Sequence, residues 1–538
     1  MIQLYFHTLR HLRWQQVTNR LARPFLTRLP VKEVPIGFAK ALGRWIEPIE
    51  KSNSLLGDSK FCFLGQTHQY SNDFPALRHD RDLWLYNVHY FECLMSSNCK
   101  TNKQLGTEWI QKWIDDFGVG SVPAWDPYPT SLRIVNWLKW YLGCGATTGA
   151  MLASLSRQVS ILINRLEHHL LGNHLFENAK ALVFASVCLT PMGGKASKAE
   201  SLRLLEKCIE DQFLVDGGHF ERAPGYHNVL LEGLLDLLNL ARAYRYEELQ
   251  KIVQPVAEKA LAWSEIMAHP DGRPPFFNDT NFDIGEPYFR LAQYAEKLGL
   301  PVPTQTKASV FLDSTGYARL VSESYQVYCD VAEVGAPYIP GHAHADTLSF
   351  ELSINGERLV TNTGVSTYEN SATRLWERGT SAHNTIQVDG LNSSQVWKSF
   401  RVGKRAQVKG ISFETNSDQT VLSAKHYGYS KLAGKISVAR QWKLDAAGLE
   451  IRDRIKGPFQ QLQSFLYLSP GVVVEPRAGG REVKAVMPCG TNVYLSISTG
   501  EIEIINGYWS PAFGVRLARL GIVIHSSEKE NLICIRHE

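Results

Sequence analysis

The chain has 538 residues, 44% of them hydrophobic, and a formal net charge of only +4 at pH 7. This length exceeds what one hydrophobic core usually supports, so we expect two or three domains. The small net charge argues against a surface devoted to nucleic-acid binding, and it is compatible with an anionic substrate held in a local cleft. The nine cysteines are scattered and include no Cys-x-x-Cys pair, so neither a zinc knuckle nor a disulfide framework is indicated, and their odd number fits a reducing compartment.

Residues 1–48 concentrate positive charge, with eight lysines and arginines against two glutamates. Helical spacing relates the apolar residues Ile2, Tyr5, Leu9 and Leu12, so we expect a basic amphipathic helix. Two interpretations stay open: docking on the chain's own domain, which we favour, and contact with an anionic membrane surface. Because we find neither a secretory signal nor a run of about 18 apolar residues, we expect a cytoplasmic location by default and leave periplasmic and membrane-peripheral ones open.

From about residue 75 to 300, apolar residues recur at the spacing of helices. We expect helices over 131–142, 161–171, 179–189 and 229–243. Several are apolar nearly all round, which is typical of helices buried on most sides in a layered array. The loops between them are rich in Gly, Pro and aromatic residues, as ligand-binding rims often are. We assign residues 49–305 to this helical domain.

After residue 305 the apolar period changes to two, which predicts strands. We expect them over 325–331, 348–354, 385–388, 438–444, 449–455 and 493–498. The dipeptide Asn355-Gly356 suits the positive φ values of a two-residue hairpin turn between two of them. Residues 306–538 are therefore predicted to form stacked antiparallel sheets.

Histidines stand at the entrances of these strands. His342 and His344 are two residues apart directly ahead of an alternating segment, so on a strand they would project from one face. Imidazoles that share a cavity can bind a metal or exchange protons near neutral pH. His383 opens another strand, and Asn362 lies on the segment that returns beside the first. This grouping favours a functional site over three unrelated structural histidines.

Two polar clusters stand at helix starts in the helical half. Asn173, His174 and Glu177 lie within one turn, where a carboxylate can fix the tautomer of a neighbouring imidazole. Tyr226 and His227 begin the leucine-rich helix, and a tyrosine there can exchange a proton if a neighbour lowers its pKa. The structural alternatives are an N-cap asparagine with its polar neighbours and an interface-packing tyrosine.

Five motifs in chain order resemble those of the heparinase II/III-like polysaccharide lyase superfamily. They are Tyr-Pro-Thr-Ser-Leu-Arg at 128–133 with its continuation to 137, Asn-His-Leu-x-x-Asn at 173–178, Gly-His-Phe-Glu through Tyr-His at 218–227, His-Ala-His-Ala-Asp at 342–346, and Ala-His-Asn-Thr at 382–385. The resemblance implies an α+β multidomain protein, in which an incomplete α/α toroid precedes a C-terminal antiparallel β-sandwich. It also implies cleavage of a uronic-acid-containing polysaccharide by β-elimination.

The resemblance assigns roles by motif position. Catalytic residues would be Tyr226, His174, His342 and Asn173, and substrate-binding residues would be Arg133, Asn136, Glu177, Glu221, His227 and Arg378. In this reaction a base removes the C5 proton and an acid protonates the departing O4, after the substrate carboxylate has been neutralised. We expect Asn173 and Arg133 to hold that carboxylate. Whether elimination is syn or anti, and so which residue is the base, stays open.

A metal site is also implied, because some relatives hold a structural zinc through two histidines and an aspartate. His344 and His383 match the histidines, but Asn362 stands where the aspartate is expected. A neutral amide is a poorer zinc ligand than a carboxylate, so a structural Zn²⁺ and a hydrogen-bonded polar cluster are both possible here. We expect no cofactor to be required.

Two other functions stay open. Toroids also carry inverting glycoside hydrolases, whose two carboxylates lie about 6.5 to 9.5 Å apart and could come from Glu177, Glu221 and Asp279. The chain could also be a non-catalytic glycan-binding or assembly protein. We expect an acidic polysaccharide or oligosaccharide as the partner, with a link to exopolysaccharide or capsule metabolism, and no nucleic acid. No motif identifies the polymer.

Overall fold

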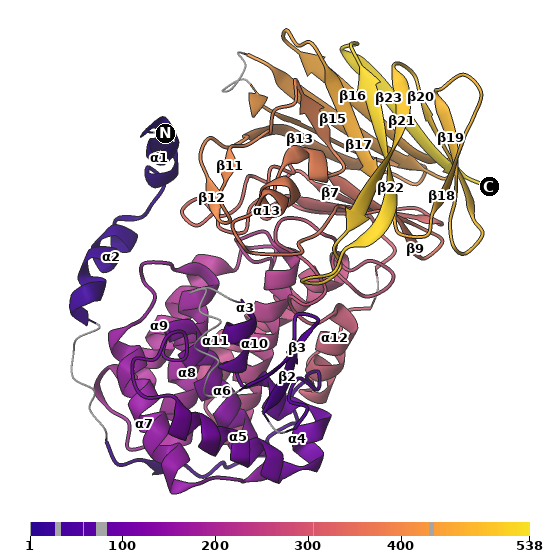
Figure 1. The fold of residues 1–538 in the computed structure, drawn as a ribbon. Helices are drawn as coiled ribbons and strands as arrows, with labels where there is room; N and C mark the ends of the chain where they lie inside the picture. Colours follow the sequence, from indigo (N-terminus) through magenta and orange to yellow (C-terminus); the bar gives the residue numbers. More distant parts are fainter. Residues whose placement is uncertain (1, 27–33, 58, 71–82, 305, 430–434) are drawn as a thin grey trace.

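In the computed structural model of the chain, the described residues are 2–26, 34–57, 59–70, 83–304, 306–429 and 435–538. They form a helical part and a β part that meet along one side, with two N-terminal helices lying against the outside of both (Figure 1). None of the described helices combines the length and apolarity needed to cross a bilayer.

The helical part is a layered array around a shared apolar core. Its helices are α3 (Leu83–Val88), α4 (Ser97–Thr101), α5 (Lys103–Asp116), α6 (Pro127–Cys144), α7 (Gly149–Asn164), α8 (Gly172–Cys188), α9 (Lys198–Gln212), α10 (Pro224–Tyr244), α11 (Glu247–Ile266) and α12 (Tyr288–Lys297). Two short strand pairs accompany them, β1 (Gly37–Phe38) with β4 (Leu189–Thr190) and β2 (Lys60–Phe63) with β3 (Gln66–Gln69). Helices α8 and α10 are buried on almost every side, as their apolar sequences predict.

The prediction of a helix over residues 161–171 is wrong. The segment expected to be helical over 161–171 leaves the helix at Asn164, where α7 ends. Leu171 then adopts a positive φ of 67°, and Gly172 follows with 56°, so the chain turns before it begins α8. A side chain at Gly172 would collide with the Glu221 carboxylate, which explains why glycine stands at this turn.

The β part consists of antiparallel sheets. A five-stranded sheet holds β5 (Val310–Leu312), β6 (Tyr317–Val321), β7 (Tyr325–Asp330), β8 (Phe350–Ile354) and β9 (Glu357–Val360) in that order. A four-stranded sheet has the order β10 (Ile386–Val388), β17 (Leu462–Tyr467), β22 (Leu517–Ser526) and β21 (Glu501–Trp509). The small hairpin β11 (Val396–Trp397) and β12 (Arg401–Val402) lies beside α13 (Ala372–Glu377).

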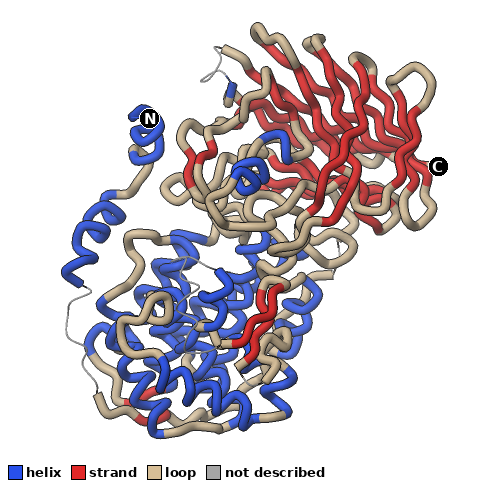
Figure 2. The backbone as a smooth tube through the Cα atoms, in the orientation of Figure 1, coloured by secondary structure: helices blue, strands red, loops and turns tan. Residues whose placement is uncertain are grey.

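The third sheet has eight strands. Its order is β13 (Val408–Thr415), β14 (Gln419–His426), β15 (Ser437–Asp445), β16 (Gly448–Lys456), β23 (Glu530–His537), β20 (Asn492–Ile497), β19 (Glu482–Val486) and β18 (Val473–Pro476). Its strands alternate between buried and partly exposed residues, and the buried face packs on residues of the other two sheets in one core. This arrangement is the predicted β-sandwich, and Figure 2 shows its separation from the helices.

The hairpin prediction is confirmed, whereas the strand entrance is not where we expected it. Asn355 and Gly356 have φ values of 51° and 85°, and Ile354 pairs with Glu357 across the turn. Strand β8 begins only at Phe350, because Leu348 adopts a positive φ of 62°. His342 and His344 therefore lie on a loop ahead of the strand.

Candidate active site

The predicted catalytic residues meet where the first turns of α8 and α10 face the loop that carries His342. Asn173 opens α8, and its backbone N–H donates to Glu221 Oε1 at 3.0 Å. The other carboxylate oxygen, Oε2, lies 3.5 Å from Nε2 of His342 and has no hydrogen-bond partner among the described residues. Glu221 therefore joins the start of α8 to a histidine of the β part, so both parts build one site.

Tyr226 packs directly on His342. Their rings are stacked, with centroids 3.9 Å apart and an interplanar angle of 27°. The Tyr226 hydroxyl lies 3.1 Å from the hydroxyl of Tyr368, a residue that the sequence analysis missed. Burial raises the pKa of Tyr226 well above its ordinary value, and the hydrogen bond from Tyr368 offsets this only in part. Tyr226 is therefore a protonated phenol at neutral pH, ready to donate.

His174 also has a raised pKa, which in an imidazole favours the positively charged form. Its Nδ1 lies 3.1 Å from Glu167 Oε1, and its side chain is 34% exposed beside the ring of Tyr128. Burial would lower the pKa of His174, but the charge and hydrogen bond of Glu167 outweigh burial and raise it. The neighbouring Asn173 side-chain amide makes no hydrogen bond to any described residue. The start of α8 thus presents the His174 imidazole, whose raised pKa favours its cationic form, beside the Asn173 amide.

Asp279 holds the histidine loop in place. Its Oδ2 lies 3.0 Å from Nδ1 of His342, and its Oδ1 lies 2.8 Å from Nε2 of His344. Arg374, at 2.5 and 2.8 Å, donates to both oxygens. Burial would raise the pKa of this carboxyl, but Arg374 and the two imidazole hydrogen bonds outweigh it and hold the pKa well below the ordinary value. Asp279 is therefore an ionised anchor between the two parts of the protein.

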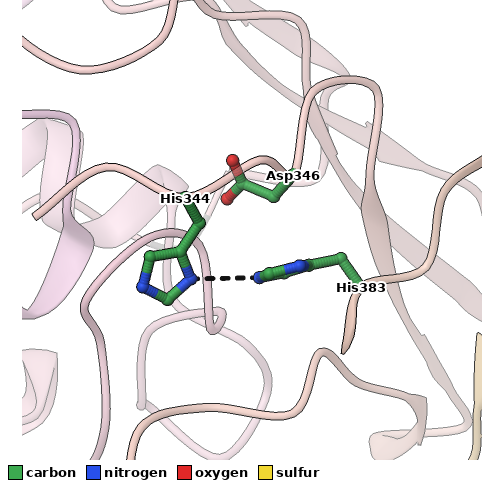
Figure 3. Close-up of side chains that lie close together, drawn as sticks. All are labelled: His344, Asp346 and His383. Carbon is green, nitrogen blue, oxygen red and sulfur yellow. Dashed lines mark hydrogen bonds between the residues drawn. The ribbon is translucent and has the colours of Figure 1, made fainter. Parts of the chain in front are cut away.

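A second histidine cluster fits a zinc ion. His344, Asp346 and His383 place one ligand atom each within 4.8 Å of one another (Figure 3). His383 Nδ1 donates to the Gly379 carbonyl at 2.7 Å, and His344 Nε2 donates to the ionised Asp279, so the lone pairs of the other two nitrogens point at each other. These nitrogens are 3.1 Å apart, close to the roughly 3.3 Å between two ligands of tetrahedral zinc.

His344 and His383 both favour the neutral imidazole, which is the form that binds a metal ion. Burial is the main cause that lowers the pKa of His344 to about 4, and burial also lowers the pKa of His383. Two lone pairs facing each other in a buried site repel unless a cation lies between them, and the Asp346 carboxylate supplies compensating charge. Two histidines and an aspartate are a ligand set that zinc accepts, and bound zinc would tie the His344 loop to the His383 segment.

The prediction that Asn362 is the third metal ligand is wrong. Its Oδ1 accepts a hydrogen bond from the Asn384 backbone N–H at 2.9 Å, so the amide is engaged away from the histidine pair. Asp346 takes its place and is oriented by the Asn278 N–H at 3.1 Å. The signal was present in the sequence, because Asp346 follows His344 at the same two-residue spacing that relates His342 to His344.

Two arginines expected to bind substrate lie in the interior instead. Arg133 is fully buried, with its guanidinium 3.9 Å from the ring centroid of Trp113 and a hydrogen bond of 2.8 Å to the Ala124 carbonyl. Arg378 is also fully buried, and it donates to the Ala343 carbonyl at 2.8 Å. Both predictions are wrong in position: Arg133 stabilises the toroid, and Arg378 supports the backbone between the two loop histidines.

Three other expected substrate-binding side chains are engaged by the protein. His227 accepts from the His219 N–H and donates to the Ala260 carbonyl at 2.9 Å, and burial lowers its pKa to about 4. Asn136 donates to the Tyr90 carbonyl at 2.8 Å, and Glu177 pairs with Lys180 at 2.6 Å. The sixth expected substrate-binding residue, Glu221, differs from these five, because it lies beside the predicted catalytic residue His342.

The residues that sequence reasoning missed are Arg374 and Tyr368, together with Asp279 in its role as an anchor. Arg374 lies 95 positions from Asp279 along the chain, and Tyr368 lies 142 positions from Tyr226. No local pattern links residues at such separations. The sequence suggests Asp279 only as a carboxylate for hydrolysis, because its loop offers no sign of the buried arginine that pairs with it.

Fold and site together define a two-domain protein, in which a helical toroid and an antiparallel β-sandwich each supply part of one polar site. The family model described as heparinase II/III N-terminus matches residues 124–296, and the model described as heparinase II/III-like, C-terminal, matches residues 304–538. The chain belongs to the heparinase II/III-like family.

Individual relatives are distant. A curated heparin-sulfate lyase from Bacteroides stercoris is 23% identical over 401 residues, which are 68% of this chain and 56% of that protein. The chain thus spans little more than half the length of this relative. A heparinase III crystal structure aligns over 83% of this chain and 75% of its own, with a TM-score of 0.66 and 16% identity. The heparan sulfate lyase HepC from Pedobacter heparinus aligns over 97% and 87%, with a TM-score of 0.59 and 18% identity. These likenesses show the fold.

Proposed function

We propose that the protein is a polysaccharide lyase that cleaves a uronic-acid-containing polysaccharide by β-elimination. The observation that carries this proposal is the contact between the Tyr226 phenol and the His342 imidazole beside the start of α8. The name of the curated relative, heparin-sulfate lyase, supports the same reaction class. A link to exopolysaccharide or capsule metabolism is part of the proposal.

His342 is the proposed base. Ionised Asp279 only accepts hydrogen bonds, so it holds the proton on Nδ1, and Nε2, which lies 3.5 Å from Glu221 Oε2, is the nitrogen that would take the C5 proton. Because Asp279 is itself fixed by Arg374, the orientation of the imidazole is set before substrate binds. Preorganisation of this kind is what general base catalysis needs.

Tyr226 is the proposed acid. Its raised pKa keeps the phenol protonated, and a protonated phenol can deliver its proton to O4 as the glycosidic bond breaks. Once Tyr226 has given up its proton, the Tyr368 hydroxyl, 3.1 Å away, can donate to the phenolate that remains and stabilise it. Acid and base therefore stand stacked against each other on one side of the site.

Asn173 and His174 are proposed to neutralise the substrate carboxylate, so His174 takes the role that the sequence predicts for Arg133. The raised pKa of His174 favours an imidazolium, and the Asn173 amide can donate beside it. Together they stabilise the negative charge that develops on the carboxylate when the C5 proton leaves. Zinc at His344, Asp346 and His383 would have a structural role, since it would steady the loop that carries His342.

The hydrolase alternative has little support in the geometry. Of its three candidate carboxylates, Asp279 is enclosed by Arg374 and two imidazoles, and Glu177 is paired with Lys180. Only Glu221 is left beside the site, whereas an inverting hydrolase needs two available carboxyl groups.

The test is product chemistry on a panel of uronate polysaccharides, including bacterial exopolysaccharides. Elimination yields a 4,5-unsaturated uronate that absorbs in the ultraviolet, so absorbance and new reducing ends should rise together. New reducing ends without absorbance would establish hydrolysis instead. Binding with neither signal on any polymer would leave a glycan-binding protein and overturn the lyase proposal.

A further inference from the structure

The two N-terminal helices form an arm on the outside of the molecule. Helix α1 (Ile2–Leu9) lies against the β part near β11 and β12, and α2 (Trp14–Leu26) lies against the helical part near α9 (Figure 1). Tyr5 of α1 contacts Trp397 with ring centroids 5.1 Å apart, and the Trp397 indole donates to the Thr8 hydroxyl at 3.2 Å. The arm thus has a defined inner face.

Helix α2 contacts both parts of the protein through polar side chains. The contacts are Gln15 with His168 at 3.1 Å, Gln16 with the carbonyls of Leu170 and Tyr338 at 3.4 and 3.3 Å, and Arg23 with His169 at 3.3 Å. A helix on the surface of a globular domain normally turns its apolar stripe toward that domain. Helix α2 instead turns its polar side chains toward the rest of the protein.

The apolar stripe of α2 faces solvent. Trp14, Leu21 and Phe25 are seven and four residues apart, so they share one side of the helix, and they are 77%, 70% and 72% exposed. Phe6 and Leu9 of α1 are also exposed, at 62% and 49%. Large apolar side chains exposed along one side of a helix mark a place where another surface binds.

The charge of the arm complements an anionic surface. Residues 1–32 contain no aspartate or glutamate but have six arginines and lysines. Among the described ones, Arg13 pairs with Asp211 of the toroid at 3.2 Å, whereas Arg10 and Arg20 are exposed on the arm. No carboxylate of the arm itself would repel a negatively charged partner.

We propose that the outer face of α1 and α2 binds the surface of an anionic lipid membrane. Trp14, Leu21 and Phe25 would enter the boundary between headgroups and acyl chains, and Arg10 and Arg20 would meet headgroup phosphates. The apolar residues are spread over two helices joined by a turn, which suits a flat, extended surface better than a groove shaped for one helix. This inference is independent of the reaction at the active site.

The test uses the full-length protein and cosedimentation with vesicles. The protein should bind vesicles of phosphatidylcholine mixed with phosphatidylglycerol, should bind phosphatidylcholine alone much more weakly, and should be released as ionic strength rises. The triple variant Trp14→Ser, Leu21→Ser and Phe25→Ser should bind at least tenfold more weakly. The single variant Arg20→Gln should weaken binding to the anionic vesicles by about fivefold, since one surface cation contributes about 1 kcal/mol.

A matched control replaces three exposed apolar residues elsewhere. Val215→Ser, Val473→Ser and Leu517→Ser change side chains that are also exposed but lie outside the arm, so this variant should bind like the wild type. Failure of the wild type to bind the anionic vesicles, or equal loss in both triple variants, would overturn the proposal. A wild-type dimer that the arm variant converts to a monomer, without vesicle binding, would show that a second copy of the chain occupies this face instead.

Discussion

Replacing Tyr226 by Phe removes one hydroxyl group and leaves the ring that stacks on His342 at 3.9 Å. The lost hydrogen bond to Tyr368 is worth about 1 kcal/mol to the fold, so the variant should remain folded. If the hydroxyl is the acid, kcat should fall by about two or more orders of magnitude, the usual effect of removing a general acid. That fall corresponds to about 2.7 kcal/mol or more of transition-state stabilisation.

Tyr368→Phe is the matched control, because it breaks the same hydrogen bond from the other end and keeps the proposed acid. It should lower kcat by about tenfold or less, since only the stabilisation of the phenolate is lost. Initial rates of ultraviolet absorbance on one uronate polymer compare the variants, and circular dichroism verifies that both are folded. Equal losses in the two variants, or wild-type kcat in Tyr226→Phe, would refute Tyr226 as the acid.

Three further predictions concern the surrounding site. Asp279→Asn should lower the free energy of unfolding in urea by about 3 to 5 kcal/mol, because buried Arg374 loses its counter-charge. Protein purified without chelator should contain about one zinc per chain, and Asp346→Asn should reduce both the zinc content and the melting temperature. Activity should fall as pH rises through the raised pKa of His174, and Glu167→Gln should move this alkaline limb to lower pH, since Glu167 favours the protonated form.

Each of these predictions has a contrary outcome. Asp271→Asn is the control for the first, because its pair with Arg358 is partly exposed and should contribute about 1 kcal/mol or less. A loss for Asp279→Asn no larger than this would contradict the anchor role. A melting temperature indifferent to chelator, with far less than one zinc per chain, would favour a hydrogen-bonded cluster. An alkaline limb unmoved by Glu167→Gln would exclude His174 as its origin.

Local pattern was enough to predict much of the secondary structure. The two-residue period placed strands at the positions of β7, β15, β16 and β20 to within a residue or two, and Asn355-Gly356 marked the β8–β9 turn. Such features depend on neighbours in sequence, because side-chain alternation and positive φ are properties of short segments. The helix expected over 161–171 ends at Asn164 instead, and the close approach of Glu221 to Gly172 at the following turn joins residues distant in sequence.

The choice among similar side chains needed the tertiary structure. Arg133 and Arg374 are both arginines near family motifs. Arg133 is buried against Trp113, whereas Arg374 forms an ion pair with Asp279 of the site. Which guanidinium meets a carboxylate depends on the packing of segments about a hundred residues apart. The same holds for Asp346, which supplies the carboxylate because a loop, and not a strand, brings it beside the two histidines.

The N-terminal arm shows this division most directly. The sequence by itself determined that residues 1–48 are basic and that their first helix is amphipathic, since both follow from residue identity and helical spacing. It could not determine which face of α2 turns inward, because an amphipathic pattern is the same in either orientation. Hydrogen-bond partners on both parts of the protein, among them His168 and the carbonyl of Tyr338, turn the polar face inward and leave Trp14, Leu21 and Phe25 exposed.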